Sequence, residues 1–129
     1  MKINNFFIIV FVIVLGSCSN AIDSDELYGI WNYIAVENFN PPDSLTSEEL
    51  IIQAPVIIFS TGNKLEIVWG GKQLSHGIYR MEGKMIRYTE FLEEGRKREF
   101  PFLIKELGED ELVFQTMEQN YTLVKAKKR

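Results

Sequence analysis

The feature that most constrains the fold is a series of eight short strand-like segments with little chain between most of them. Apolar and polar residues alternate along these segments, and this period of two indicates strands that bury one face. The segments cover residues 28–37, 56–60, 64–69, 73–82, 84–92, 96–107, 111–117 and 121–126. Because the connections are mostly short turns, neighbouring strands are expected to be antiparallel. The sequence therefore predicts an all-β domain.

Eight consecutive antiparallel strands favour closure. An open sheet would leave two long unpaired edges, and an up-and-down barrel removes them. We therefore predict an eight-stranded antiparallel up-and-down barrel. Thr46 and Glu49 form a capping-box pattern in the long first connection, which predicts a short helix near residues 47–53. Pro101 predicts a bulge or irregular pairing inside its strand, because proline donates no ladder hydrogen bond.

The N-terminal segment has the features of a secretory signal. Lys2 provides a positive start, and residues 6–15 form a run of ten apolar residues. A run of this length is typical of a signal peptide and is too short to cross a bilayer as a helix. Gly16 and Ser17 are small residues that follow the run, and Cys18 comes directly after them.

The four residues Leu15-Gly16-Ser17-Cys18 resemble the lipobox of bacterial lipoproteins, in which the Cys is acylated and becomes the first mature residue. Cys18 is the only Cys of the chain, so it forms no internal disulfide. The alternative is an ordinary secretory signal with a free Cys nearby. The lipobox resemblance implies a signal peptide (1–17) and a lipidated Cys with a tether (18–26), and the predicted barrel domain follows them (27–129). It also implies a lipid-anchored protein of the bacterial cell envelope, with the outer membrane favoured by Ser19.

Composition and charge exclude several function classes. Hydrophobic residues make up 46% and charged residues 25% of the chain, which is typical of a globular protein. The formal net charge of -4 gives no indication of a nucleic-acid partner. One His and one Cys leave no multi-His or Cys/His metal site. Ser75 and His76 are adjacent on a strand and point to opposite faces, so they cannot act as a nucleophile and its base. We therefore predict no enzyme activity, catalytic residue, cofactor or metal.

The alternation also assigns side chains to the two ends of the barrel. An even number of strands returns the C-terminus to the rim where the first strand begins. Trp31 is expected in the closed end near that rim, with Gly29 before it allowing the backbone to turn in. Six side chains are expected to face inward near the open end and to bind a ligand there: Tyr33, Trp69, Tyr88, Glu90, Phe100 and Tyr121.

Glu90 has two interpretations. It is in phase with Ile86 and Tyr88 and is expected to point inward, where a carboxylate requires a partner or a proton. In the first interpretation, Glu90 orients a polar group of a ligand. In the second, it pairs with an inward polar or basic residue at the rim.

Three short motifs carry a family resemblance. Gly29-Ile30-Trp31 resembles the Gly-x-Trp motif of lipocalins. Gly77-Ile78-Tyr79 with the following Met81-Glu82-Gly83, and the turn between Leu107 and Leu112, are similar to small bacterial lipocalin-like lipoproteins. The resemblance covers residues 27–126 and implies an eight-stranded antiparallel barrel. This family contains carriers, a few enzymes and many proteins without a known role. The chain departs from it in having no disulfide and no helix after the last strand.

Two functions of different class follow. The first is a membrane-anchored binding protein for a small hydrophobic or amphipathic molecule. The second is an envelope interaction or structural module that has a filled barrel, no small-molecule ligand and a protein partner. An apolar cavity at the open end would favour the first, and a solid interior with an exposed apolar patch on residues 38–54 would favour the second.

Overall fold

The computed structural model describes residues 21–39 and 42–129, and the predicted lipobox with Cys18 lies outside these residues. In chain order the elements are η1 (Ser24–Leu27), β1 (Gly29–Asn38), β2 (Asp43–Ser44), α1 (Ser47–Gln53), β3 (Val56–Ser60), β4 (Lys64–Trp69), β5 (Lys72–Glu82), β6 (Met85–Phe91), η2 (Glu93–Gly95), β7 (Lys97–Leu107), β8 (Glu111–Thr116) and β9 (Thr122–Lys128). No helix within the described ranges combines the length and the apolar character needed to cross a membrane.

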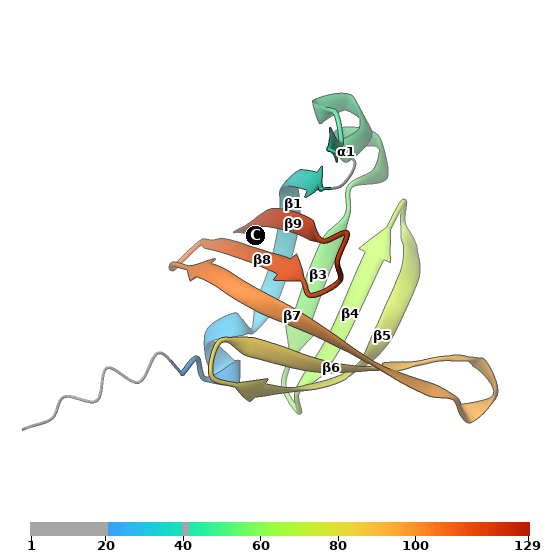
Figure 1. The fold of residues 1–129 in the computed structure, drawn as a ribbon, viewed down its shortest axis with the longest axis vertical. Helices are drawn as coiled ribbons and strands as arrows, with labels where there is room; N and C mark the ends of the chain where they lie inside the picture. The colour runs from blue at the N-terminus through green and yellow to red at the C-terminus, as the bar shows by residue number, and fades with distance from the viewer. Residues whose placement is uncertain (1–20, 40–41) are drawn as a thin grey trace, which may run out of the picture.

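The strands form a closed antiparallel barrel, as the alternation predicts. β3 to β9 pair in consecutive order, and β1 pairs with both β3 and β9. The barrel therefore contains eight strands, β1 and β3 to β9, and Figure 1 shows how they curl around a common interior. The ninth strand, β2, pairs with the end of β1 and was not predicted. Its two residues are exposed and too few to show an alternation.

The end of the barrel where β1 begins is solid. Leu27 and Trp31 are both fully buried there. The Trp31 indole Nε1 donates a hydrogen bond of 2.8 Å to the Leu27 carbonyl, and the Lys128 ammonium lies 5.4 Å from the indole centroid. Tyr79 donates from its hydroxyl to the Ser24 carbonyl at 3.2 Å, which holds η1 across this end.

Aromatic rings fill the middle of the barrel and connect its walls. The Phe102 ring packs against Phe114 in an edge-to-face contact of 5.4 Å and stacks on Tyr88 at 6.0 Å. Tyr33 meets Phe114 edge-on at 6.0 Å. Such contacts add specific geometry to the burial of large apolar surfaces. These contacts therefore link β1, β6, β7 and β8 across the interior.

The irregular pairing expected inside the strand of Pro101 is present in β7, but it does not lie at Pro101 itself. The register of β6 with β7 runs through the pair Arg87 and Pro101 without a shift. The pairing of β7 with β8 begins at Phe102, so Pro101 has no partner in β8. The missing N–H of Pro101 therefore interrupts no hydrogen bond between these two strands. The register shift of β7 instead occurs between Ile104 and Glu106.

The two ends of the described chain meet at the closed end. The backbone N–H of Arg129 donates to the Ile30 carbonyl at 2.8 Å, as strand parity predicts. The backbone N–H of Ile22 donates to the Gly83 carbonyl at 3.1 Å, so the first described residues lie at the same rim. Figure 1 shows β2 and α1 at the far end of the molecule from this entry.

The helix α1 lies at the open end of the barrel (Figure 1). Its N-cap Thr46 accepts from the Glu49 backbone N–H at 3.1 Å, and the Glu49 carboxylate accepts from the Thr46 N–H at 3.2 Å. At its other end Gly70 donates to the Gln53 carbonyl at 2.7 Å, which ties the helix to the turn between β4 and β5.

Candidate binding site

An apolar cavity of about 400 Å³ lies at the open end of the barrel. Its walls come from β1, β4, β5, β7, β8 and β9 and from the segment before α1. The lining residues are Tyr33, Val36, Asn38, Leu45, Ile67, Trp69, Leu74, Phe102, Phe114, Thr116, Thr122 and Val124. Most of these side chains are aliphatic or aromatic, and the few polar ones are uncharged. The cavity therefore offers an apolar environment of the size that small ligands occupy.

The aromatic side chains of this cavity hold one another in place. The Tyr33 ring lies edge-on to Trp69 at 6.2 Å between centroids. Burial raises the pKa of the Tyr33 hydroxyl far above its ordinary value, because the tyrosinate form would lose its hydration. Leu45 packs from the connecting segment, and its N–H donates to the Val36 carbonyl at 3.0 Å.

A second cavity of about 390 Å³ adjoins the first and is partly polar. The two cavities share Ile67, Leu74 and Phe102 in their linings, so they lie side by side. The remaining residues of the second cavity come from β5, β6 and β7 and are Ser75, Tyr88, Glu90, Arg98 and Phe100. Together the cavities form a space with an apolar compartment and a compartment that carries hydrogen-bonding groups.

The polar side chains of the second cavity form one connected chain of hydrogen bonds. The Arg98 Nη2 donates to the Glu90 Oε1 at 2.6 Å. The Ser75 hydroxyl donates to the other carboxylate oxygen of Glu90. The Ser75 and Tyr88 hydroxyl oxygens lie 2.6 Å apart. Because the Ser75 hydrogen is already donated to Glu90, Tyr88 is the donor in this contact.

The side chains joined by these hydrogen bonds differ sharply in burial. The Glu90 side chain is 12% exposed, whereas the Arg98 side chain is 58% exposed and lies over the Phe100 ring at 5.4 Å. Burial raises the pKa of Tyr88 to about 12, with the hydrogen bond to Ser75 opposing and the Glu90 charge adding to the shift. Tyr88 therefore stays a neutral hydrogen-bond donor across the physiological pH range.

The structure brings together five of the six predicted ligand residues. Tyr33 and Trp69 line the apolar cavity, and Tyr88, Glu90 and Phe100 line the partly polar one. Tyr121 lines neither cavity, so its expected inward position is wrong. Its ring stacks on Phe39 at 4.7 Å.

The physical reason for the Tyr121 error is the phase of β9. This strand begins at Thr122, and its buried residues are Val124 and Ala126. Tyr121 is one position out of phase with them, so the alternation directs Thr122 inward instead.

Two polar residues of the site were missed by the sequence reasoning. Ser75 was considered only as a partner of His76, which the structure places on the outside, exposed and 5.8 Å from the Phe91 ring. Arg98 was not predicted as a site residue. A signal was available, because Glu90 and Arg98 are equally distant from the turn at Glu93–Gly95 and so face each other across the hairpin. Glu90 pairs with a basic residue at the rim, as its second interpretation expects.

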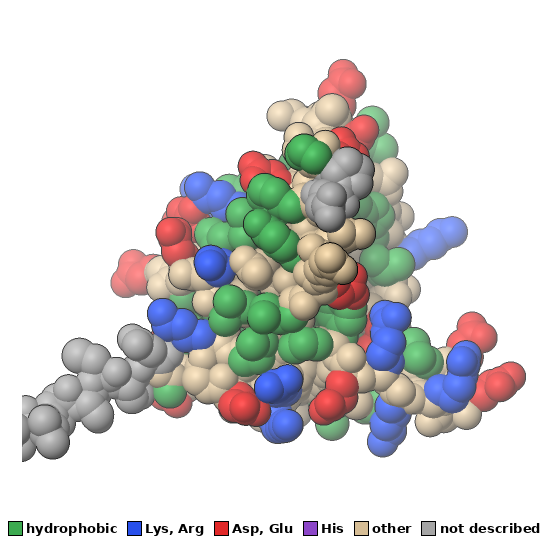
Figure 2. Space-filling model, in the orientation of Figure 1, with side chains coloured by type: hydrophobic (Ala, Val, Ile, Leu, Met, Phe, Trp, Pro, Cys, Tyr) green, Lys and Arg blue, Asp and Glu red, His purple; other side chains and the backbone are tan. Residues whose placement is uncertain are grey.

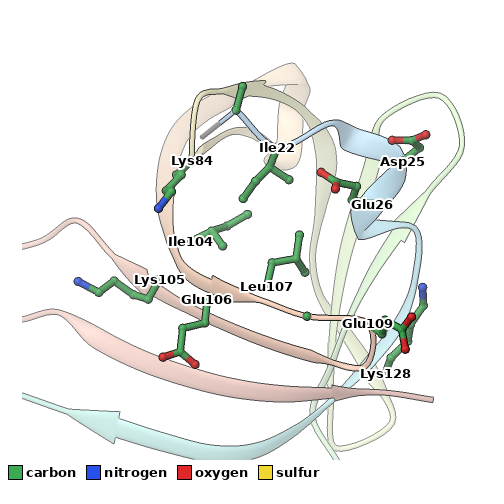
Figure 3. Close-up of a pocket in the computed structure, with 12 residues that line it drawn as sticks. Ile22, Asp25, Glu26, Lys84, Ile104, Lys105, Glu106, Leu107, Glu109 and Lys128 are labelled. Carbon is green, nitrogen blue, oxygen red and sulfur yellow. The ribbon is translucent and has the colours of Figure 1, made fainter. Parts of the chain in front are cut away.

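A third hollow of about 660 Å³ lies at the closed end, between the entry of the chain and the turn from β7 to β8. Figure 3 shows Ile22, Ile104 and Leu107 near its middle, with charged side chains around them. The charges have both signs and come from Asp25, Glu26, Lys84, Lys105, Glu106, Glu109 and Lys128. This hollow has neither an apolar lining nor a field of one sign, so it is a weaker candidate than the open end.

The described part of the chain contains no group of three or more His, Cys, Asp or Glu side chains that could hold a metal ion. Comparison of the sequence and the structure with protein-family models, curated proteins and solved structures finds no significant match. The geometry of the two adjoining cavities is therefore the basis for assigning a function.

Proposed function

We propose that the protein is a lipid-anchored, lipocalin-like binding protein that holds a small hydrophobic or amphipathic molecule at the open end of its barrel. The observation that carries the proposal is the pair of adjoining cavities, of which one is apolar and the other has a buried chain of hydrogen-bonding groups. An amphipathic molecule would bury its apolar part beside Trp69 and Phe114 and place its polar part near Glu90. Binding sites for small molecules commonly combine an apolar lining with a few placed polar groups.

The site and the anchor would lie at opposite ends of the barrel. The described chain begins at the closed end, where Ile22 is bonded to the β5–β6 turn. If Cys18 carries lipid, the closed end is the part of the barrel nearest the membrane, and the open end faces away from it. This arrangement suits the capture of a ligand from the aqueous side.

The second candidate function is an interaction module. The observation that favours it is the exposure of two adjacent isoleucines on α1, Ile51 at 77% and Ile52 at 75%. Exposed apolar side chains on one short helix are a possible contact for an envelope protein. The two functions make different predictions about the cavity, because an interaction module does not require an apolar space at the open end of the barrel.

Replacement of Cys18 tests the anchor. Cys18→Ala removes the only thiol and is expected to abolish labelling by a radioactive or clickable fatty acid, and to move the protein from the membrane to the soluble fraction. Asn20→Ala is the matched control, since it changes a neighbouring residue and leaves the thiol in place. Unchanged labelling and membrane partition of the Cys18→Ala protein would contradict the anchor.

Binding of an apolar fluorescent probe tests the cavity. We expect the mature chain carrying Cys18→Ala to bind the probe saturably, and Trp69→Ala to weaken binding about tenfold, because it removes an apolar wall worth about 1.4 kcal/mol. Ile78→Ala is the control, since Ile78 is 46% exposed on the outer face of β5 and lines neither cavity. Absence of saturable binding, with no small molecule in native mass spectra of the protein from its source membrane, would favour the interaction module.

A further inference from the structure

The partly polar cavity is balanced in charge. Glu90 and Arg98 are the two charged side chains that line it in the described part of the chain, and they are joined at 2.6 Å. A ligand head group with a net charge would have two options in this cavity. It could break the ion pair of Glu90 and Arg98 to bind one of them, or it could stay beside the intact pair without a counter-charge of its own. Either event is costly, because a desolvated charge needs a partner.

The charges around the cavity mouth do not alter this balance. The hairpin of β6 and β7 carries Arg96 and Lys97 next to Glu93, Glu94 and Glu99. Figure 2 shows Lys and Arg side chains beside Asp and Glu side chains at this hairpin, in the lower right of the view. The hairpin therefore presents no field of a single sign to attract an anion or a cation.

The direction of the hydrogen bonds defines what the cavity still offers. Tyr88 donates to Ser75, and Ser75 donates to Glu90, so both hydroxyl hydrogens are used within the protein. The Tyr88 and Glu90 oxygens keep further lone pairs. The Arg98 guanidinium has five N–H donors, of which the contact with Glu90 uses one. The site thus presents acceptors on one side and donors on the other.

We infer that the ligand is an uncharged amphiphile whose head group both donates and accepts hydrogen bonds, such as a long-chain alcohol or primary amide. This inference rests on the proposed function. The head group accepts from the Arg98 guanidinium and donates to the Tyr88 or Glu90 oxygen, while the apolar chain occupies the adjoining cavity beside Trp69. A carboxylate head group only accepts, and an ammonium head group only donates, so each satisfies half of the site.

A matched set of amphiphiles tests the inference. Decanol, decanoate and decylammonium have the same apolar chain and differ in the head group. Their affinities are measured by displacement of the fluorescent probe from the mature chain carrying Cys18→Ala, below the concentration at which each amphiphile aggregates. We expect decanol to bind at least about tenfold more tightly than either charged amphiphile, which is the scale of one unbalanced charged hydrogen bond.

Two substitutions should shift this selectivity in opposite directions. Glu90→Gln leaves the Arg98 guanidinium without its carboxylate and is expected to raise the affinity for decanoate relative to decanol about tenfold. Arg98→Gln leaves the Glu90 carboxylate without its guanidinium and is expected to favour decylammonium by a similar factor. Arg98 is largely exposed, so the second variant keeps the test valid if Glu90→Gln impairs folding. Arg96→Gln is the control, since Arg96 does not line the cavity.

The outcomes separate the inference from the proposed function. Preference of the unmodified site for decanoate or decylammonium, or equal affinity for all three, would overturn the inference and leave a binding protein in place. Selectivity unchanged by both Glu90→Gln and Arg98→Gln would overturn it as well. Binding of neither the probe nor any amphiphile would overturn the proposed function itself.

Discussion

Replacing Trp31 by alanine is expected to lower the free energy of unfolding by about 3–5 kcal/mol, the range for large buried aromatic side chains. Trp31 is fully buried in the closed end, and its indole N–H bonds to the Leu27 carbonyl at 2.8 Å. The substitution removes the apolar surface and also leaves that carbonyl without its donor. The change is measured by urea denaturation followed by far-ultraviolet circular dichroism.

Two variants calibrate this expectation. Trp31→Phe keeps most of the apolar volume and loses the hydrogen bond, so its loss of stability should be clearly smaller than that of Trp31→Ala. Trp69→Ala also truncates an indole, but Trp69 is only partly buried at the open end, so a smaller loss is again expected. If Trp69→Ala proved more destabilising than Trp31→Ala, the closed end would not be the principal packing centre.

The barrel was predictable because its determinants are local. Strands and turns are specified by patterns that span only a few residues, such as the alternation of Leu65 with its charged neighbours. Closure of the barrel then follows because both edges of the sheet need a partner. The meeting of Arg129 with Ile30 then follows from the number of strands alone. The inward phase of Glu90 was predictable for the same reason.

The details that failed depend on where strands begin and end. Tyr121 does not face inward because the inward residues of β9 are Val124 and Ala126, and a shift of one position reverses the face of a side chain. The irregularity expected in the strand of Pro101 occurs further along β7, and Pro101 itself fits a regular register because β8 ends opposite Phe102, a length that no local pattern reveals. The partnership of Arg98 with Glu90 depends on the register of the hairpin, which the alternation of apolar and polar residues does not specify.

Gly77→Ala is expected to be among the most damaging single substitutions in the barrel. Gly77 lies on the inward face of β5, between Ser75 and Tyr79. A Cβ atom at this position would lie 1.9 Å from the Thr89 carbonyl oxygen and 3.0 Å from the Tyr88 Cε1. The first of these atoms belongs to the backbone of β6, so a side-chain rotation cannot relieve the clash.

The barrel can accommodate that methyl group only if β5 and β6 move apart. Overpacking of a well-filled interior costs about 1–3 kcal/mol and occasionally more, and a backbone clash belongs at the upper end, so we expect a loss of about 3 kcal/mol. Gly77 is paired with Glu90 in the β5–β6 register. The same movement would therefore also disturb the hydrogen bond between the Ser75 hydroxyl and the Glu90 carboxylate. Weakened probe binding should therefore accompany the loss of stability.

Gly108→Ala provides the matched control for this prediction. Gly108 has no positive φ, and a Cβ there would meet only the Glu111 carbonyl oxygen, at 3.9 Å. The same chemical change should alter stability by no more than about 0.5 kcal/mol, or raise it slightly by restricting the unfolded chain. Both variants are compared by urea denaturation and probe titration. Equal stability of the two would show that the close approach of β5 and β6 at Gly77 does not determine the packing of the barrel wall beside the partly polar cavity.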